Sequence, residues 1–283
     1  MKVKKKSSSL SSPKSSIQSI DNEEDGQPVS DEAKGKEIDP LTDEEIQESE
    51  YLTELFGQET VAMIYTENWE VKYQCLVELC DIIKQLSNKK SQNSAFQSLS
   101  PIINRMFASN LKSIYIKAVD QTISLIDELN ENGTFSEDGG FPRNIVHQLL
   151  NASFSKLNNA SERENKASIK FIKWASKNDK FLMNDIIQFI LKPSQKQTTA
   201  LLYQNKLDLL GYIIKENENI IDVKDFMPFV LKCLESLNSD VRSSAIKLYE
   251  ACFNIYGKKV QKYIKNLPKT IKKELLIASG VKT

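Results

Sequence analysis

The chain has 283 residues, of which 40% are hydrophobic and 27% charged, and its 38 basic and 38 acidic residues balance formally. This composition is typical of a soluble protein of one or two domains and excludes fibrous and low-complexity classes. No apolar run approaches the roughly 18–20 residues that cross a bilayer, and no apolar stretch follows the basic N-terminus. We therefore expect an intracellular protein with no secretory signal and no membrane partner.

Residues 1–50 form a leader of unusual composition. It is Ser-rich at first, as in "SSSLSSPKSSIQS", and then mainly acidic, with seven lysines and thirteen acidic residues in total. Such a segment buries too little apolar surface to offset the loss of backbone entropy on ordering, so we predict disorder over 1–50. Residues 51–283 keep 31 basic and 25 acidic residues, a net charge of +6.

From Tyr51 onward the sequence has the period of amphipathic helices. One stretch, "WEVKYQCLVELCDIIKQL", places apolar residues at spacings of three and four, from Val71 through Cys75 and Leu79 to Leu86. Alternating, strand-like stretches are absent, and the breaks are short, polar segments that often contain the helix-capping residues Asn, Ser or Asp. The sequence predicts an all-α domain over residues 51–283 with roughly a dozen helices.

The helices follow a repeating rhythm. Five segments that each begin a second helix can be superposed, and their equivalent positions are 43, 49, 38 and 40 residues apart; these positions are Cys75, Ala118, Ala167, Asn205 and Ala245. These four spacings scatter around the roughly 40–47 residues that form one HEAT or armadillo unit. With a degenerate pair at 258–282, we predict an α-solenoid of about six HEAT-like helix pairs.

Catalytic and metal-binding patterns are missing from the sequence. The one histidine, His147, lies among apolar residues of a predicted helix, and no nucleophile is tied to it by a motif. The four cysteines also lie among apolar residues, without a Cys-x-x-Cys spacing, which favours core packing over metal binding. No phosphate-binding glycine loop occurs. We expect a protein that is not an enzyme and has no cofactor or metal.

The turn inside the first helix pair carries a large aromatic residue. Trp69 lies between polar residues directly before a helix. An indole at such a place can anchor a protein interface, since it buries a large area at little entropic cost. It can equally fold back as a lid on its own helix, and the local sequence leaves both interpretations open. Trp174, in contrast, is predicted to be a core residue.

The corresponding turns of the later pairs carry cations and amides: Asn110, Lys112, Arg163, Lys166, Lys192, Lys196 and Arg242. If the repeats stack, these side chains lie along one edge, spaced by a helix-packing distance of about 10 Å. Such an edge, with Trp69 at one end, suits a large acidic protein surface. Exposed lysines in turns are often only solvated, and Arg242 has the alternative role of holding turns together inside the solenoid.

Residues 52–264 resemble a TOG domain, the tubulin-binding HEAT paddle of microtubule polymerases and CLASP-type proteins. More narrowly, they resemble the single TOG domain of the centrosomal and ciliary-tip protein family. The resemblance rests on "FGQETVAMIYTENWEVKYQCLVEL", "SERENKASIKFIKWAS", "IQFILKPSQKQ" and "CLESLNSDVRSSAIKLYEACFNIYG". The turn with the tryptophan and the Val-Arg turn are its sharpest parts.

The resemblance implies that Trp69 inserts against tubulin and that basic residues of the later turns meet its acidic surface. Lys72 stands where the family commonly has arginine, which keeps the charge but loses the planar fork. The tubulin-binding residues implied or predicted are Trp69, Lys72, Asn110, Lys112, Arg163, Lys166, Lys196 and Arg242.

The leading hypothesis is a microtubule-associated protein that binds tubulin or microtubule ends, at ciliary tips or centrosomes, where other proteins of these structures are further candidate partners. The rival hypothesis is a generic HEAT or armadillo adaptor that binds another protein through its helical face and does not bind tubulin. A net charge of +6 without aromatic stacking positions between the basic residues argues against nucleic acid as a partner.

Overall fold

The computed structural model describes residues 40–135, 140–159, 161–192, 199–217 and 220–280. Every regular element within these residues is a helix, which confirms the predicted all-α class. None of the described helices combines the length and the apolar character needed to cross a lipid bilayer. In chain order the elements are α1 Asp43–Glu48, α2 Glu50–Phe56, α3 Gln58–Tyr65, α4 Trp69–Gln85, α5 Lys89–Ala108, α6 Lys112–Glu131, α7 Arg143–Lys156, α8 Glu162–Asn178, α9 Lys180–Leu191, α10 Ala200–Glu216, α11 Val223–Leu234, α12 Ser239–Tyr256, α13 Lys258–Gln261, the 3₁₀ helix η2 Lys262–Asn266 and α14 Lys269–Ala278.

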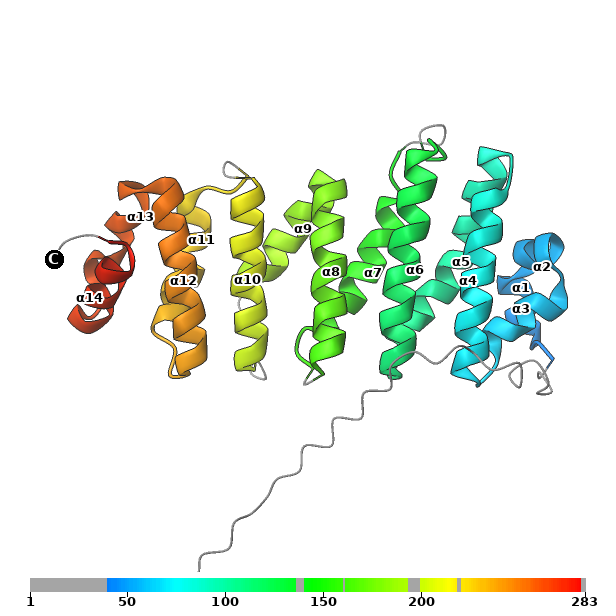
Figure 1. Ribbon diagram of the computed structural model, residues 1–283, viewed down its shortest axis with the longest axis horizontal. Coiled ribbons are helices and arrows are strands. Elements are labelled where there is room, and N and C mark those ends of the chain that lie inside the picture. Colours follow the sequence, from blue (N-terminus) through cyan, green and yellow to red (C-terminus); the bar gives the residue numbers. More distant parts are fainter. Residues whose placement is uncertain (1–39, 136–139, 160, 193–198, 218–219, 281–283) are drawn as a thin grey trace, which may run out of the picture. The chain divides into compact units, whose positions relative to one another are not determined.

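Consecutive helices pair, and the pairs follow one another in a row (Figure 1). The second helices of the pairs, α4, α6, α8, α10 and α12, lie side by side in one layer, and each contacts the next. Their partners α3, α5, α7, α9 and α11 form the other layer. With α13, η2 and α14 as an irregular last pair, this arrangement confirms the predicted α-solenoid of about six helix pairs.

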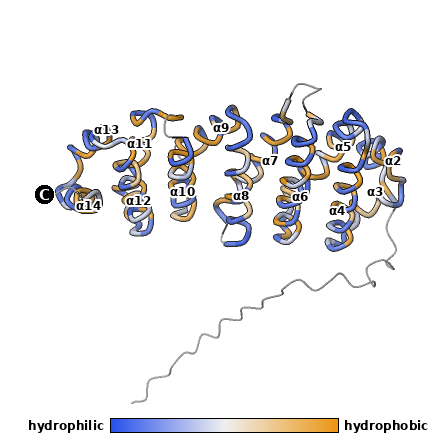
Figure 2. The backbone as a smooth tube through the Cα atoms, turned by 45° about the horizontal axis from the view of Figure 1, so that its top comes forward, coloured by the Kyte–Doolittle hydropathy of each residue, from blue (hydrophilic) through white to orange (hydrophobic). Residues whose placement is uncertain are grey.

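The core runs without interruption through the whole row of helices. The helices from α3 to α12 bury one face, and apolar and hydrophilic stretches alternate along their course (Figure 2). The second helix of each of the first five pairs contributes fully buried side chains to this core. Among them are Leu79, Tyr115, Phe171, Leu210 and Tyr249. No pair could bury its apolar face alone, so each pair depends on its neighbours.

The folded part begins earlier than the boundary at residue 51 that we predicted. Helix α1 opens at Thr42 with a capping box, in which the Thr42 and Glu45 side chains each bind the other's backbone. Glu48 pairs with Arg105 of α5, and Leu41 is buried in the core. An ion pair to a residue 57 positions away in the chain is invisible in local composition, which explains the error. The rest of the predicted disordered leader, residues 1–39, lies outside the described residues.

Asparagine side chains fix where the second helices begin. The Asn68 side-chain Oδ1 accepts hydrogen bonds from the backbone N–H groups of Glu70 and Val71 at 3.1 and 3.4 Å. Asn238 accepts in the same way from Asp240 and Val241 at 2.9 and 3.1 Å. These N-caps satisfy donors that have no partner within the helix, so the polar breaks in the sequence do set the helix starts.

A buried lysine links the second pair of helices to the third. The Lys156 ammonium donates a hydrogen bond of 2.6 Å to the backbone carbonyl of Ser109, which follows α5. It also lies 3.4 Å from the Glu164 carboxylate, and both side chains are almost completely buried. The carbonyl belongs to the turn between α5 and α6, so Lys156 holds that turn against α7 and α8.

Two further buried polar residues, both on α10, hold the next turns. The Asn205 amide donates to the Leu157 carbonyl and to the Asn165 side chain, each at 2.9 Å. The Lys206 ammonium donates to the Lys192 carbonyl at 3.2 Å, at the end of α9. Because the last carbonyls of a helix have no partner within it, these donors satisfy groups that burial would otherwise leave unpaired.

We predict that Lys156→Met destabilises the fold by about 3–5 kcal/mol, because it leaves the Glu164 carboxylate buried without its counter-charge. The measurement is urea unfolding followed by circular dichroism. The double variant Lys156→Met with Glu164→Met should recover part of the loss, since removal of both charges is often close to neutral. Lys180→Met, at an exposed position, is the matched control. A loss for Lys156→Met no larger than for this control would contradict a structural role of the ion pair.

Lys206 gives the fold a distinctive dependence on pH. Burial lowers the pKa of Lys206 to about 8, from the ordinary lysine value of 10.5. Between these values the unfolded chain binds more protons at this site than the folded chain, so stability rises with pH across the window. The unfolding free energy of the wild type, relative to Lys206→Met, should therefore increase from about pH 8 to about pH 10. Lys215→Met on the same helix is the exposed control, and a difference that stays flat would contradict the lowered pKa.

Candidate functional site

The turns inside the helix pairs lie along one edge of the solenoid. Because α4, α6, α8, α10 and α12 stand side by side and run in the same direction, their first turns all lie at the lower edge in Figure 1. We call this edge the turn margin and number its turns 1 to 5, from the α3–α4 turn to the α11–α12 turn. The structure thus brings together, on one edge, the predicted residues that it describes: Trp69, Lys72, Asn110, Lys112, Arg163, Lys166 and Arg242. Lys196 in turn 4 lies outside the described residues.

Trp69 of turn 1 is neither free nor fully covered. It is the first residue of α4, and its half-buried ring packs against the edge of the core. The Lys117 ammonium of α6 lies 5.0 Å from the centre of its ring and 4.1 Å from the centre of the Tyr73 ring, one turn further along α4. This cation–π contact orients the indole at the margin, while part of the indole remains accessible.

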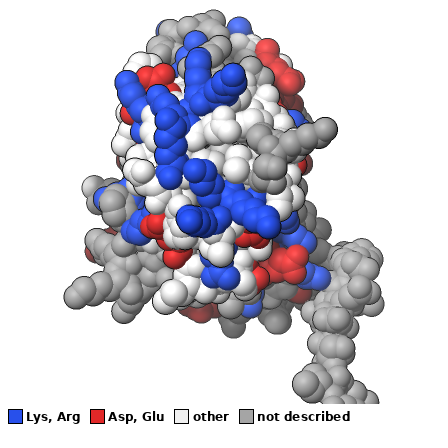
Figure 3. All heavy atoms as spheres, turned by 90° about the vertical axis from the view of Figure 1, so that its left-hand side faces the viewer, with Lys and Arg blue, Asp and Glu red and all other residues white. Residues whose placement is uncertain are grey.

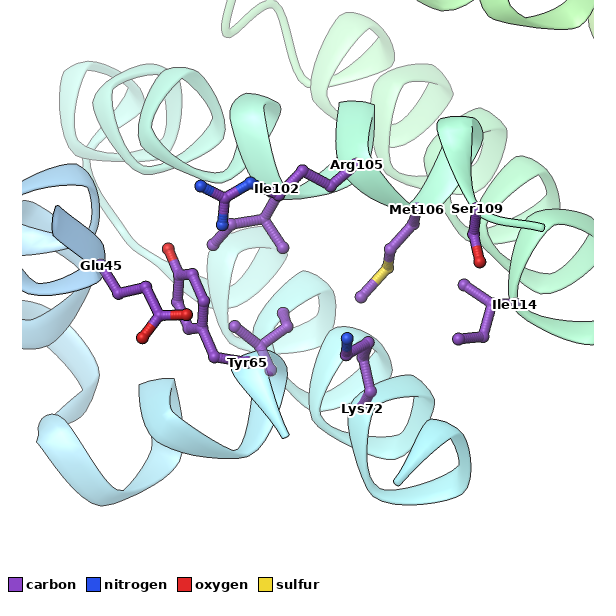
Figure 4. A pocket seen from close by; sticks show the side chains of 9 residues that line it. Glu45, Tyr65, Lys72, Ile102, Arg105, Met106, Ser109 and Ile114 are labelled. Carbon is purple, nitrogen blue, oxygen red and sulfur yellow. The ribbon is translucent and has the colours of Figure 1, made fainter. Parts of the chain in front are cut away.

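Lys72 borders a cavity beside turn 1 (Figure 4). The cavity has a volume of about 260 Å³ and lies between α1, α3, α4, α5 and the start of α6. Its lining combines the apolar side chains of Ile102, Met106 and Ile114 with polar groups of other residues, and Lys72 borders it from α4. Burial lowers the pKa of Lys72. The nearby carboxylate of Glu67 raises this pKa, and the positive charge of Arg105 lowers it further. The described residues offer Lys72 no ion pair, so a carboxylate from a partner could supply one.

The opposite side of the cavity holds a second cation. The Arg105 guanidinium lies 5.4 Å from the centre of the Tyr65 ring, and Figure 4 shows both side chains reaching across the cavity. Arg105 is already paired with Glu48, and Glu45 of α1 also borders the cavity. Among the described residues Lys72 is therefore the cation of this cavity that has no ion pair. The sequence analysis did not identify Arg105 or the cavity, because α1 was assigned to the leader.

The middle of the turn margin carries exposed polar residues. Asn110, Lys112 and Arg163 are exposed, and within the described residues neither Lys112 nor Arg163 has an ion pair. Lys166 is exposed as well but lies 2.7 Å from Glu162, one turn earlier on α8. An exposed pair of this kind contributes little to stability and can open to meet a partner.

Arg242 of turn 5 binds its own turn. Its guanidinium donates hydrogen bonds to the backbone carbonyls of Ser236 and Leu237 at 2.8 and 2.9 Å. The alternative role considered for Arg242 was to hold neighbouring turns together, whereas these hydrogen bonds stay within turn 5. The side chain is half-buried, so its first function in this structure is to shape turn 5.

Two exposed leucines on the turn margin escaped the sequence analysis. Leu111 in turn 2 is 51% exposed, and Leu237 in turn 5 is fully exposed at 101%. Leu111 is the N-cap residue of α6, and Leu237 directly precedes the N-cap residue of α12. Trp69 likewise directly adjoins an N-cap residue, that of α4. The signal in the sequence was an apolar residue inside an otherwise polar turn. With Trp69 they provide apolar contact points at three of the five turns.

The four cysteines, His147 and Trp174 have ordinary structural roles. All four cysteines are buried, and burial raises the pKa of each thiol to about 12, which disfavours the reactive thiolate. His147 is exposed on α7, with its Nε2 atom 3.6 Å from the Asp185 carboxylate. Trp174 packs on the core but is not fully buried, and its indole N–H donates to Asp127 at 2.7 Å. Within the described residues no group of three or more His, Cys, Asp or Glu side chains could hold a metal ion.

Known structures share this arrangement of helices. The chain aligns with the TOG domain of CEP104 at a TM-score of 0.65 and 16% identity, covering 85% of this chain and 96% of that one. The TOG domain of human Cep104 gives a TM-score of 0.63 at 14% identity, with coverages of 88% and 100%. TOG3 of Drosophila melanogaster Mini spindles gives 0.62 at 16% identity, with coverages of 80% and 94%.

At this level of identity the similarity establishes the fold: the chain has the fold of TOG domains, as the resemblance in the sequence implied. No protein-family model matches the sequence. No curated protein sequence matches it either.

Proposed function

We propose that the chain is a microtubule-associated protein that binds tubulin through the turn margin. The observation that carries this proposal is the coincidence of a TOG-domain fold with an accessible indole and several cations on the one edge formed by the turns. Other TOG domains of this fold are described as binding tubulin and as recruiting it in microtubule polymerases. The proposed role is binding rather than catalysis.

The geometry assigns different tasks to the residues of the turn margin. Trp69, Leu111 and Leu237 offer exposed apolar area, which drives association when it leaves water. Lys112 and Arg163 lie between them and would steer the margin toward an acidic surface. Because the turns are held by buried donors, the margin needs little rearrangement on binding, which reduces the entropic cost of association.

In this proposal the TOG-like domain of this chain offers one tubulin-binding surface, which suits docking on or stabilising microtubule ends, whereas the delivery of subunits would draw on the avidity of several such domains. We further propose that this takes place at ciliary tips or centrosomes. The support for that location is the resemblance to the single TOG domain of the centrosomal and ciliary-tip family, together with the match to the TOG domain of CEP104.

We predict that Trp69→Ala weakens tubulin binding by at least about 30-fold, the loss typical of an aromatic hot-spot residue. Binding of the full chain to unpolymerised tubulin is measured by sedimentation or fluorescence, and circular dichroism checks the helical content. The matched control is Phe181→Ala, which removes an exposed aromatic residue at the opposite edge. Normal tubulin binding by Trp69→Ala would overturn the anchor role, and loss of helical structure would favour the lid interpretation.

We also predict that the double charge reversal Arg163→Glu with Lys166→Glu weakens tubulin binding about tenfold or more at low salt, and less at high salt, because screening reduces the repulsion. The control is Lys90→Glu with Lys180→Glu, which reverses two exposed lysines in the first turns of α5 and α9, at the opposite edge. Equal effects of the two double variants would show that only net charge matters. No binding by the wild type at any salt concentration would favour the adaptor hypothesis.

A further inference from the structure

The excess positive charge of residues 51–283 is confined to the C-terminal end of this segment. Residues 51–256 contain 23 basic and 24 acidic residues, whereas residues 257–283 contain eight basic residues and one acidic residue. The net charge of +6 therefore does not come from residues 51–256, which contain the turn margin. It belongs to the last, irregular pair of helices.

Seven of these lysines lie on α13, η2 and α14, and we call the surface that they form the lysine end face: Lys258, Lys259, Lys262, Lys265, Lys269, Lys272 and Lys273. Figure 3 looks onto this end of the row of helices and shows lysine side chains gathered on it. Six of the seven are exposed, and Lys272 is half-buried. Within the described residues none of the seven takes part in an ion pair, so their charges are not neutralised by the fold.

The lysine end face is hollowed by a cavity of about 320 Å³. Its apolar lining comes from Ile264 and Leu276, and Lys258, Lys262, Lys265 and Lys272 surround this lining. Ile277 on α14 is 62% exposed beside the cavity's Leu276. The surface thus combines a small apolar depression with a ring of cations.

We propose that the lysine end face binds an acidic, extended segment of a partner protein and accommodates one apolar side chain of that segment in the cavity. Carboxylates spaced along an extended chain match cations spaced around a depression, and the volume suffices for one large aliphatic or aromatic side chain. This interaction goes beyond the proposed function, since Trp69 and the lysine end face lie in the first and last helix pairs of the row.

The composition of the lysine end face favours a peptide over the other polyanions. All of its cations are lysines, which act as point charges and lack the planar fork with which arginine holds phosphates in two places. Single-stranded nucleic acid would require several aromatic stacking platforms, and Tyr263 is the one aromatic residue in the described part of 257–280. A bilayer surface would leave the concave, partly apolar cavity unfilled.

The test measures binding of two fluorescent peptides to the full chain by polarisation. One peptide is glutamate-rich with a single central phenylalanine, and the other has glycine in place of the phenylalanine. We expect the phenylalanine peptide to bind more tightly than the glycine peptide, and its binding to weaken as salt is added. We expect Lys262→Glu with Lys265→Glu to lower its affinity about tenfold or more.

Lys89→Glu with Lys90→Glu is the matched control, because it makes the same charge change at the start of α5 and should leave the affinity unchanged. An equal loss in this control would reduce the effect to net charge and overturn the proposal, as would absence of peptide binding. Equal affinities for the two peptides would overturn the role of the cavity. Tighter binding of a DNA duplex or of phosphatidylserine vesicles than of the peptide would overturn the choice of partner. The assay contains no tubulin, so its outcome is independent of the proposed function.

Discussion

The structure depends on one constraint: a helix pair of this size cannot bury its apolar face alone and must cover it with the next pair. Stacking on both sides forces α4, α6, α8, α10 and α12 to stand side by side in the same direction. Residues about 40 positions apart in the chain thereby become neighbours on one edge. Trp69, Lys112 and Arg163 share the turn margin for this reason alone, since no contact between them is needed to bring them together.

Buried polar side chains then fix the turns on that edge. Lys156, Asn205 and Lys206 donate to carbonyls at the ends of first helices, and Arg242 does the same within turn 5. A cation beside a helix C-terminus also complements the helix dipole, which offsets part of the cost of burying its charge. The result is a margin whose shape is set before any partner arrives. Such preorganisation favours affinity, because fewer groups lose freedom on binding.

The two surfaces of this protein differ in chemistry. The turn margin lies in a part of the chain that is close to neutral, so its apolar side chains must contribute much of any affinity, and its cations chiefly guide orientation. The lysine end face has the reverse character, with uncompensated charge around a small apolar depression. The turn margin lies on the first five helix pairs and the lysine end face on the last pair of the same row, so they are separate from one another.

The sequence by itself determined the helical class, the rhythm of helix pairs and the positions of the turns. These features follow from a period of three to four residues and from caps such as Asn68 and Asn238, and such signals are complete within a few residues of chain. The excess of lysine after residue 256 was equally present in the composition. Only the tertiary structure decided that Glu48 orders α1 by pairing with Arg105, that Lys117 lies over the Trp69 ring, and that the last lysines surround a cavity. Most of these contacts join residues far apart in the chain, and even the nearby lysines gain their arrangement from packing, which local patterns do not record.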